Sequence, residues 1–199
     1  MDHYYSEKPI SKSERKNWET TIGGKEFTFA TDAGVFSKDK IDFGSEVLIK
    51  TASQTHFPAG NLLDVGCGYG PIGLALAREF PEKQIEMIDI NERAINLAKE
   101  NAKLNKITNV NIHQSDLYAE VESKKIAGIL SNPPIRAGKK VVHQILEEAY
   151  HYLIDGGILQ IVIQKKQGAP SAQKKMKEVF GNVERVNLEK GYWILEARK

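Results

Sequence analysis

A single cysteine and the lack of long apolar runs set the first limits on this sequence. Cys67 is the one thiol among 199 residues, so no disulfide can form within the chain. The polar amino-terminal stretch resembles neither a signal peptide nor a membrane span, and the five histidines show no metal-ligand spacing. We therefore expect a cytoplasmic protein with no metal site and no membrane partner, in which Cys67 is only a small loop residue.

Neither sign of charge dominates the sequence as a whole. The formal net charge is +2, which by itself does not indicate a nucleic-acid binder. The distribution is less even, because from Lys165 onward nine basic side chains stand against four acidic ones. Such a run is typical of a solvated helix face, and it also suits a surface that meets an acidic partner.

The first sixty residues carry their own pattern. Residues 18–31 alternate around Gly23-Gly24, a pair typical of a tight β-hairpin turn, and residues 42–53 show apolar positions at helical spacing. A hydrophobic content of 41% suits one domain with a substantial core. We expect residues 1–56 to form a hairpin-and-helix extension packed on a domain of residues 57–199, as one globular unit.

From residue 61 onward, short apolar runs alternate with amphipathic stretches, which predicts strands and helices around a parallel sheet. The last two strands are joined too tightly for a parallel crossover and should pair antiparallel. The fold class is therefore α/β, a Rossmann-like doubly wound sheet with a carboxyl-terminal antiparallel hairpin. The expected strands are 61–66, 84–89, 109–113, 126–131, 157–163, 183–188 and 191–197, and the expected helices are 71–80, 91–104, 139–153 and 171–180.

A glycine-rich segment, Asp64 to Gly73, joins the first of these strands to a helix. Bare backbone at such a junction lets a ligand approach amide groups, which predicts a cofactor loop. Gly68, Gly70 and Gly73 also match the dinucleotide pattern G-x-G-x-x-G, so this loop alone leaves a nicotinamide dehydrogenase open. A glycine turn with no ligand is the remaining interpretation.

Polar side chains follow the next two strands. Asp89 stands about twenty residues after the glycines, where a carboxylate can accept both hydroxyls of an adenosine ribose. It would equally suit a helix amino terminus, although Asn91 could cap that helix. Ser115 and Asp116 follow the third strand, where a side chain could meet the adenine amino group or simply close a turn.

Asn132-Pro133-Pro134 follows the fourth strand, at the edge where open α/β sheets bind ligands. Two successive prolines fix the backbone and remove two donors, which leaves a stiff run of carbonyls. The Asn132 side-chain oxygen and the Pro133 carbonyl could each hold one N–H of a planar amine. A dehydrogenase has no use for this arrangement, and transfer of an activated methyl group to the amine requires it, without a strong base.

Together, the segment from Asp64 to Gly73, Asp89 and Asn132-Pro133-Pro134 resemble the motifs of class I S-adenosylmethionine methyltransferases that modify planar amines. The stretch from Phe29 to Ser37, with Asp42 and Gly44 after it, resembles the catalytic domain of small-subunit (16S) ribosomal RNA guanine-N2 methyltransferases, of the methyltransferase small domain family. The resemblance covers roughly residues 20 to 197. It implies a seven-stranded sheet, S-adenosylmethionine as cofactor with S-adenosylhomocysteine as product, and a guanine flipped out of its RNA.

The resemblance also implies roles for individual residues. Asn132, Pro133 and Pro134 would be the catalytic residues. Phe36 would partly close the cofactor pocket. The expected cofactor-binding residues are Phe36, Asp64, Gly66, Gly68, Gly70, Asp89, Ile90, Ser115, Asp116 and Asn132, and the expected substrate-binding residues are Ile135, Arg136, Lys139, Lys165 and Tyr192.

The sequence departs from the family in two respects. Several members carry two tandem domains, and these 199 residues carry one. The family's mode of RNA binding therefore cannot be assigned in full to this chain. The sequence indicates neither the modified nucleotide nor the oligomeric state. Amine methyltransferases with this motif usually place an aromatic residue where Ile135 stands, so base stacking must come from elsewhere. The candidates are Tyr192, Trp193, Tyr69 and Phe36, of which Trp193 also suits a core position.

Three functions remain at this point. The first is methylation of the N2 amine of a guanine in ribosomal RNA, as naked RNA or within a ribosomal subunit. The second is N5-glutamine methylation of a translation release factor, although those enzymes usually begin with a helical substrate domain. The third is a non-catalytic ribosome-assembly factor that binds the cofactor or RNA, against which the intact Asn132-Pro133-Pro134 argues.

Overall fold

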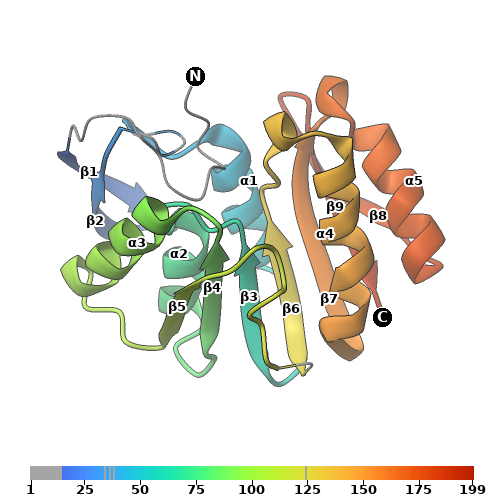
Figure 1. Ribbon diagram of the computed structural model, residues 1–199, viewed down its shortest axis with the longest axis horizontal. Coiled ribbons are helices and arrows are strands. Elements are labelled where there is room, and N and C mark those ends of the chain that lie inside the picture. The colour runs from blue at the N-terminus through green and yellow to red at the C-terminus, as the bar shows by residue number, and fades with distance from the viewer. Residues whose placement is uncertain (1–14, 34, 36, 38, 124) are drawn as a thin grey trace.

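The computed structural model describes residues 15–33, 35, 37, 39–123 and 125–199. It contains a two-stranded antiparallel sheet and a seven-stranded mixed sheet with strand order β5-β4-β3-β6-β7-β9-β8 (Figure 1). The strands from β5 to β7 run parallel to their neighbours, and β9 pairs antiparallel with β7 and β8. The predicted doubly wound sheet with a carboxyl-terminal hairpin is confirmed.

The elements follow the expected alternation closely. The strands are β1 (Lys16–Ile22), β2 (Lys25–Thr31), β3 (Asn61–Val65), β4 (Ile85–Asp89), β5 (Val110–Gln114), β6 (Ile126–Ser131), β7 (Leu153–Gln164), β8 (Glu184–Glu189) and β9 (Tyr192–Arg198). The helices are α1 (Phe43–Ala52), α2 (Pro71–Glu79), α3 (Glu92–Leu104), α4 (Lys139–Tyr152) and α5 (Ala169–Phe180), with short 3-10 turns η1 (Ile135–Ala137) and η2 (Lys165–Gln167).

The hairpin of β1 and β2 turns at Gly23-Gly24, as predicted. Ile22 pairs with Lys25, so the turn contains only the two glycines, and both have positive φ, +56° and +78°. Two-residue turns with positive φ at both positions match the twist of paired strands. The two glycines therefore supply the positive φ that this tight turn requires.

Two asparagines, one within α3 and one at its carboxyl-terminal cap, attach this hairpin to the main domain. Asn101 receives a hydrogen bond from the Ala30 amide at 2.7 Å and donates to the Ala30 carbonyl at 3.0 Å. Asn105 makes the same pair of bonds with Thr28. The side-chain amides thus complete the edge of β2 in place of another strand, and Asn101 also donates to the carbonyl of Tyr69 in the glycine loop.

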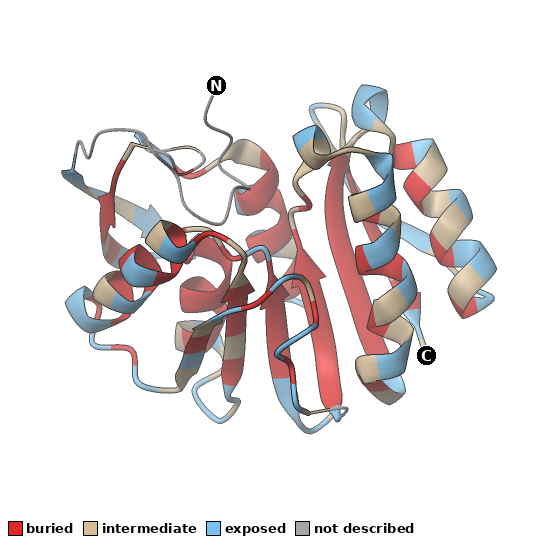
Figure 2. Cartoon of the chain, viewed as in Figure 1, coloured by how far each residue is buried: buried red, intermediate tan, exposed pale blue. Residues whose placement is uncertain are grey.

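Two hydrophobic cores lie on opposite faces of the large sheet. One joins the hairpin to α1, α2 and α3 through residues such as Phe29, Leu48 and Leu97, and the other places α4 and α5 on the sheet through Ile145 and Met176. Figure 2 shows the buried residues concentrated on the strands and on the inner sides of these helices. Within the part of the chain that the structure describes, no helix is long and apolar enough to cross a membrane.

The boundaries differ from the prediction most clearly at β7. We expected a helix to residue 153 and a strand from 157, with a turn between them, but β7 already begins at Leu153. The register against β6 shifts after the pair Leu153–Ile126, and Gly156 adopts φ +77° inside the strand. Backbone bonds of Gly156 and Gly157 to Lys199 keep this segment extended. Helix α5 begins at Ala169, two residues early, with a proline in its first turn.

Candidate active site

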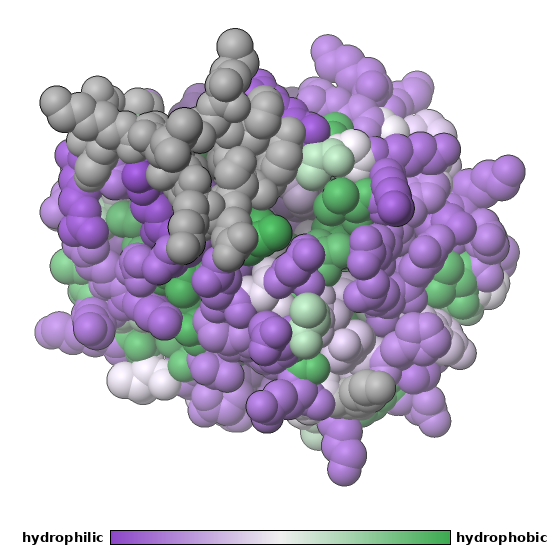
Figure 3. Space-filling model, in the orientation of Figure 1, coloured by the Kyte–Doolittle hydropathy of each residue, from purple (hydrophilic) through white to green (hydrophobic). Residues whose placement is uncertain are grey.

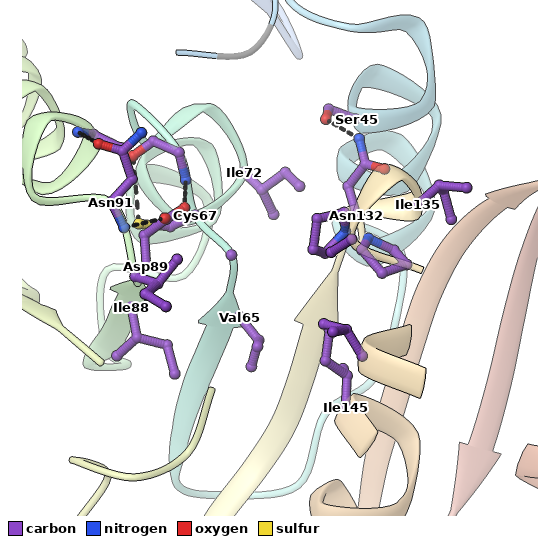
Figure 4. Close-up of a pocket in the computed structure, with 18 of the residues that line it drawn as sticks. Ser45, Val65, Cys67, Ile72, Ile88, Asp89, Asn91, Asn132, Ile135 and Ile145 are labelled. Atoms are coloured by element: carbon purple, nitrogen blue, oxygen red, sulfur yellow. Dashed lines mark hydrogen bonds between the residues drawn. The ribbon is translucent and has the colours of Figure 1, made fainter. Parts of the chain in front are cut away.

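A cavity of about 490 Å³ opens at the carboxyl ends of β3, β4, β5 and β6. The loops that follow these strands form its walls, as the motifs predicted. Figure 4 shows Asp89 and Asn91 on one side and Asn132 and Ser45 on the other, with Val65 and Ile72 between them. The predicted site residues that line the cavity are Gly66, Gly68, Asp89, Ile90, Ser115, Asp116, Asn132, Pro133, Pro134, Ile135, Arg136 and Tyr192.

Other predicted residues lie outside this lining. Asp64 and Gly70 stand behind the glycine loop, and Lys139 and Lys165 are exposed at the start of α4 and in η2. Phe36, which we expected to cover the cofactor, lies outside the described residues. The proposed contacts of these five with a ligand stay predictions.

Asp64 holds the glycine loop from behind. Its Oδ2 accepts a hydrogen bond from the Gly73 amide at 2.8 Å, and its Oδ1 is buried without a partner among the described residues. Burial raises the pKa of this carboxyl from 3.8 to about 7, against the opposing effect of the Gly73 bond. Gly73 is needed for packing, because a Cβ there would lie 2.6 Å from Met87.

The next part of the loop is open toward the cavity. Gly66 and Gly68 have φ of +76° and +58°, a region that other residues rarely adopt. Among the described residues, a Cβ at either position would meet no atom within 4 Å. The loop therefore exposes bare backbone to the cavity, which suits close approach by a bound cofactor.

Asp89 is fixed by backbone amides from both sides. Its Oδ2 accepts from Gly68 at 2.8 Å and its Oδ1 from Asn91 at 2.9 Å, while the Asn91 side chain caps α3. Burial raises the pKa of Asp89, and these amide bonds oppose the rise. Each carboxylate oxygen keeps acceptor capacity, so the half-buried side chain fits a ribose diol.

Ser115 and Asp116, which follow β5, differ in burial and in their hydrogen bonds. Ser115 is buried, and its hydroxyl donates to the Leu117 carbonyl at 2.6 Å and accepts from the Glu120 amide at 3.1 Å. This is the turn-closing role that the sequence left open. The neighbouring Asp116 is exposed and lines the cavity. The carboxylates of Asp89 and Asp116, which accept hydrogen bonds, and the exposed backbone of the glycine loop thus fit an adenosine-containing cofactor.

Asn132 faces this cofactor side from the end of β6. Its Nδ2 donates to the Asp42 carboxylate and to the Ser45 hydroxyl, both at 2.9 Å, and Figure 4 shows the amide turned toward Ser45. Pro133 is buried and Pro134 is half-buried, so the carbonyl run is held firmly. Within the described part of the chain, no hydrogen bond engages the oxygen of Asn132 or the Pro133 carbonyl, so both remain available as acceptors.

The aromatic candidates for base stacking differ in how far they are exposed to the cavity. Trp193 is buried in the core beside α4 and α5, the structural position that the sequence allowed. Tyr69 lines the cavity, but only 2% of it is exposed and its ring packs against Trp18 and Phe29. Tyr192 lines the cavity and is only half-buried. Among the described candidates, Tyr192 is the one whose ring is accessible.

Several lining residues were not predicted as site residues, and the polar side chains of Asp42, Ser45 and Gln167 are among them. Asp42 and Ser45 come from the first turn of α1, and Gln167 comes from η2 after β7. Asp42 and Gly44 entered only through the family resemblance. The one local signal was that Asp42 stands where a helix amino-terminal cap belongs.

Basic residues stand on the outer side of the Asn132 loop. Arg136 is exposed in η1, Lys139 and Lys140 are exposed at the start of α4, and Lys165 and Lys166 are exposed in η2. Hydrophilic side chains cover most of the face seen in Figure 3. Among residues 15–33, 35, 37, 39–123 and 125–199, no group of three or more histidine, cysteine or acidic side chains is placed to hold a metal ion.

Residues 26–196 match the methyltransferase small domain family. The chain belongs to this family. The predicted methyltransferase class and S-adenosylmethionine as cofactor are thereby confirmed, and the dehydrogenase interpretation of the glycine loop no longer applies.

Individual relatives agree with this membership. The chain is 55% identical over 199 residues to the uncharacterized protein YbxB of Bacillus subtilis, covering 100% of this chain and 98% of that protein. It is 33% identical over 190 residues to ribosomal RNA small subunit methyltransferase C of Photorhabdus laumondii, covering 94% of this chain and 54% of the relative.

A solved structure shows the same fold. The T. thermophilus 16S ribosomal RNA N2 G1207 methyltransferase, in complex with AdoMet and guanosine, superposes with a TM-score of 0.83 at 23% identity, over 96% of this chain and 52% of that one. The chain thus spans about half the length of the ribosomal RNA methyltransferases that it matches.

Proposed function

We propose that this methyltransferase acts on the exocyclic N2 amine of a guanine in ribosomal RNA. The observation that carries the proposal is the Asn132-Pro133-Pro134 loop, which opens on the same cavity as Asp89 and the glycine loop. Relatives that are named as ribosomal RNA methyltransferases support the class of substrate.

In this proposal the cofactor lies along the glycine loop. Asp89 accepts the ribose hydroxyls, Ile90, Ser115 and Asp116 surround the adenine, and the backbone of the loop meets the amino-acid part. Asp64 and Gly70 act from behind by holding that backbone, as their positions support. The predicted cofactor contacts of Phe36 and Asn132 complete this set. S-adenosylmethionine supplies, when bound, a methyl group on a sulfonium and leaves as S-adenosylhomocysteine.

The chain's own contribution is to orient and polarise the amine. The Asn132 oxygen and the Pro133 carbonyl each accept one N–H of the guanine amine, so its lone pair faces the methyl group. Fixed acceptors stabilise the positive charge that develops on nitrogen, and alignment lowers the entropic part of the barrier. One amine proton is then lost to water. Pro134 keeps this segment rigid.

The surroundings of the loop support an RNA substrate. Tyr192 offers an accessible ring for the base, and Ile135 and Arg136 line the same side of the cavity. Arg136, Lys139 and Lys165 would meet phosphates, which position a nucleic acid without reading its sequence. We propose these five as the substrate contacts.

Methyl transfer in solution tests the proposal. Labelled S-adenosylmethionine is incubated with the purified protein and ribosomal RNA, naked or in subunits, from cells that lack this chain. We expect label in N2-methylguanosine, and Asn132→Ala should lower kcat by about 100-fold or more, the scale of losing a fixed transition-state contact. Asn111→Ala, an exposed asparagine on β5, is the matched control and should retain activity.

The alternatives give different products. Label in a glutamine of a translation release factor would replace the RNA substrate, and label in another base would overturn guanine N2. Cofactor binding with no transfer to RNA or protein would favour the non-catalytic assembly factor. Label in a guanine of large-subunit RNA would support guanine methylation and would change only the ribosomal subunit that carries the modified nucleotide.

A further inference from the structure

The amide nitrogen of Asn132 has no hydrogen left for a ligand. It carries two N–H bonds, and both are engaged, one by Asp42 Oδ2 and one by Ser45 Oγ, each at 2.9 Å. A carboxylate only accepts hydrogen bonds, so Asn132 cannot be turned over without placing two oxygens together. The oxygen is therefore the polar atom of this side chain that remains for an amine.

Both partners come from the first turn of one helix. Asp42 caps α1, and the same Oδ2 that meets Asn132 also accepts from the Ser45 amide at 3.1 Å. Ser45 is buried, with 5% of its surface exposed. The helix thus fixes the carboxylate and the hydroxyl relative to each other, 87 or more residues away from Asn132 in the sequence.

Gly44 keeps this turn tight against the cavity wall. A Cβ at position 44 would lie 2.9 Å from Asp42 Oδ2 and 3.0 Å from the ring of Tyr192. Any larger residue would push apart the carboxylate and the accessible aromatic ring. The cap of α1, the Asn132 amide and Tyr192 therefore form one packed unit on the acceptor side of the cavity.

We propose that Asp42 and Ser45 are positioning residues that aim the Asn132 oxygen at the substrate amine. The proposal rests on the proposed function. The negative charge of Asp42 lies one hydrogen bond from the amide, and charge-assisted, linked hydrogen bonds polarise each other. A more negative Asn132 oxygen stabilises the positive charge that develops on the amine nitrogen during transfer. The effect belongs to the transition state and should appear in kcat.

Three substitutions separate this role from simple capping of the helix. Asp42→Asn keeps a good cap and an oxygen for both N–H groups but removes the charge. Asp42→Ala removes the cap, the charge and one partner of Asn132, and Ser45→Ala removes the other partner alone. Ser53→Ala is the matched control, because its hydroxyl bonds the Lys50 carbonyl at the opposite end of α1.

Kinetics of methyl transfer to guanine give the first test. We expect kcat to fall about 10-fold in Asp42→Asn and in Ser45→Ala and about 100-fold in Asp42→Ala, the scale of one or two lost polar contacts in a transition state. The KM for S-adenosylmethionine should stay within about 3-fold, since no binding contact is removed. Ser53→Ala should match the wild type. Asp42→Asn with wild-type kcat would show that the charge has no role.

Combination with Asn132→Ala tests the proposed connection. If Asp42 and Ser45 act through Asn132, their substitutions should add no further loss once Asn132 is alanine, because coupled residues are not additive. Losses that multiply fully in the double variants would overturn the proposal and leave only a structural role for the cap.

Nuclear magnetic resonance tests the network without turnover. In protein labelled with nitrogen-15 at asparagine, the Asn132 side-chain signal is the one lost in Asn132→Ala. Its two protons should exchange slowly in the wild type and faster in Asp42→Ala and Ser45→Ala. Exchange as fast as that of the exposed Asn111 in the wild type would overturn the network. Slow exchange in a protein that transfers no methyl group to RNA would instead refute the proposed function alone.

Discussion

The carboxyl of Asp64 is buried and makes a hydrogen bond through only one of its two oxygens among the described residues. One oxygen holds Gly73 while the other has no partner among the described residues. A buried charge with unfilled acceptor capacity is costly, so burial favours the protonated form and raises the pKa to about 7. The motif that predicted a cofactor loop therefore also contains a group that titrates near neutral pH.

This titration should make folding stability depend on pH. The folded protein holds a proton on Asp64 that the unfolded chain releases above pH 3.8, so its stabilising contribution is complete below that value and is lost as pH rises to about 7. Each pH unit in this window removes up to about 1.4 kcal/mol. We expect urea unfolding at pH 5 and pH 8 to show a smaller loss in Asp64→Asn than in the wild type.

Asp155→Asn, a change at an exposed carboxyl, serves as the control and should leave the wild-type difference unchanged. An equal change with pH in the wild type and in Asp64→Asn would contradict the role of Asp64.

Single residues also show where sequence reasoning stops. Gly66, Gly68, Asp89 and Asn132 line one cavity because each lies at or just beyond the carboxyl end of a parallel strand, and these ends meet at one edge of the sheet. The partners of Asn132 were not predicted, since Asp42 lies 90 residues earlier and nothing local connects it to a loop after β6. Only the packing of α1 beside that loop creates the contact.

At the scale of elements, α3 joins the amino-terminal hairpin to the glycine loop. Asn101 is fully buried and bonds both backbone groups of Ala30 and the carbonyl of Tyr69. The amphipathic pattern predicted this helix correctly. It could not distinguish a buried asparagine that completes a strand edge from one on a solvated face, because both interrupt the apolar pattern alike.

Removing this link should destabilise the fold. Asn101→Ala leaves three buried backbone groups without a partner, and we expect a loss of about 2 to 4 kcal/mol in the free energy of unfolding. Urea denaturation checks this value. The exposed Asn111→Ala should change stability by less than about 0.5 kcal/mol. A similar small change in Asn101→Ala would mean that the hairpin edge is satisfied in another way.

For the whole molecule, α1 contributes side chains to the site, and the hairpin shares a hydrophobic core with α1. Helix α1 supplies Asp42 and Ser45 to the cavity, and the hairpin packs in the same core as α2 and α3. We propose that residues 1–56 are an extension of the methyltransferase domain of residues 57–199, in one globular unit. The alternation of elements predicted the sheet well, and the boundary error at β7 arose because backbone bonds to Lys199, 43 residues after Gly156, keep a glycine pair extended.

The most direct test measures N2-methylguanosine in ribosomal RNA from cells. Ribosomal RNA from cells lacking this chain, and from cells restored with the wild type or with Asn132→Ala, is digested to nucleosides and analysed by mass spectrometry. We expect one N2-methylguanosine to be lost with the chain, to return with the wild type and to stay absent with Asn132→Ala. An unchanged amount of N2-methylguanosine in all these strains would contradict it.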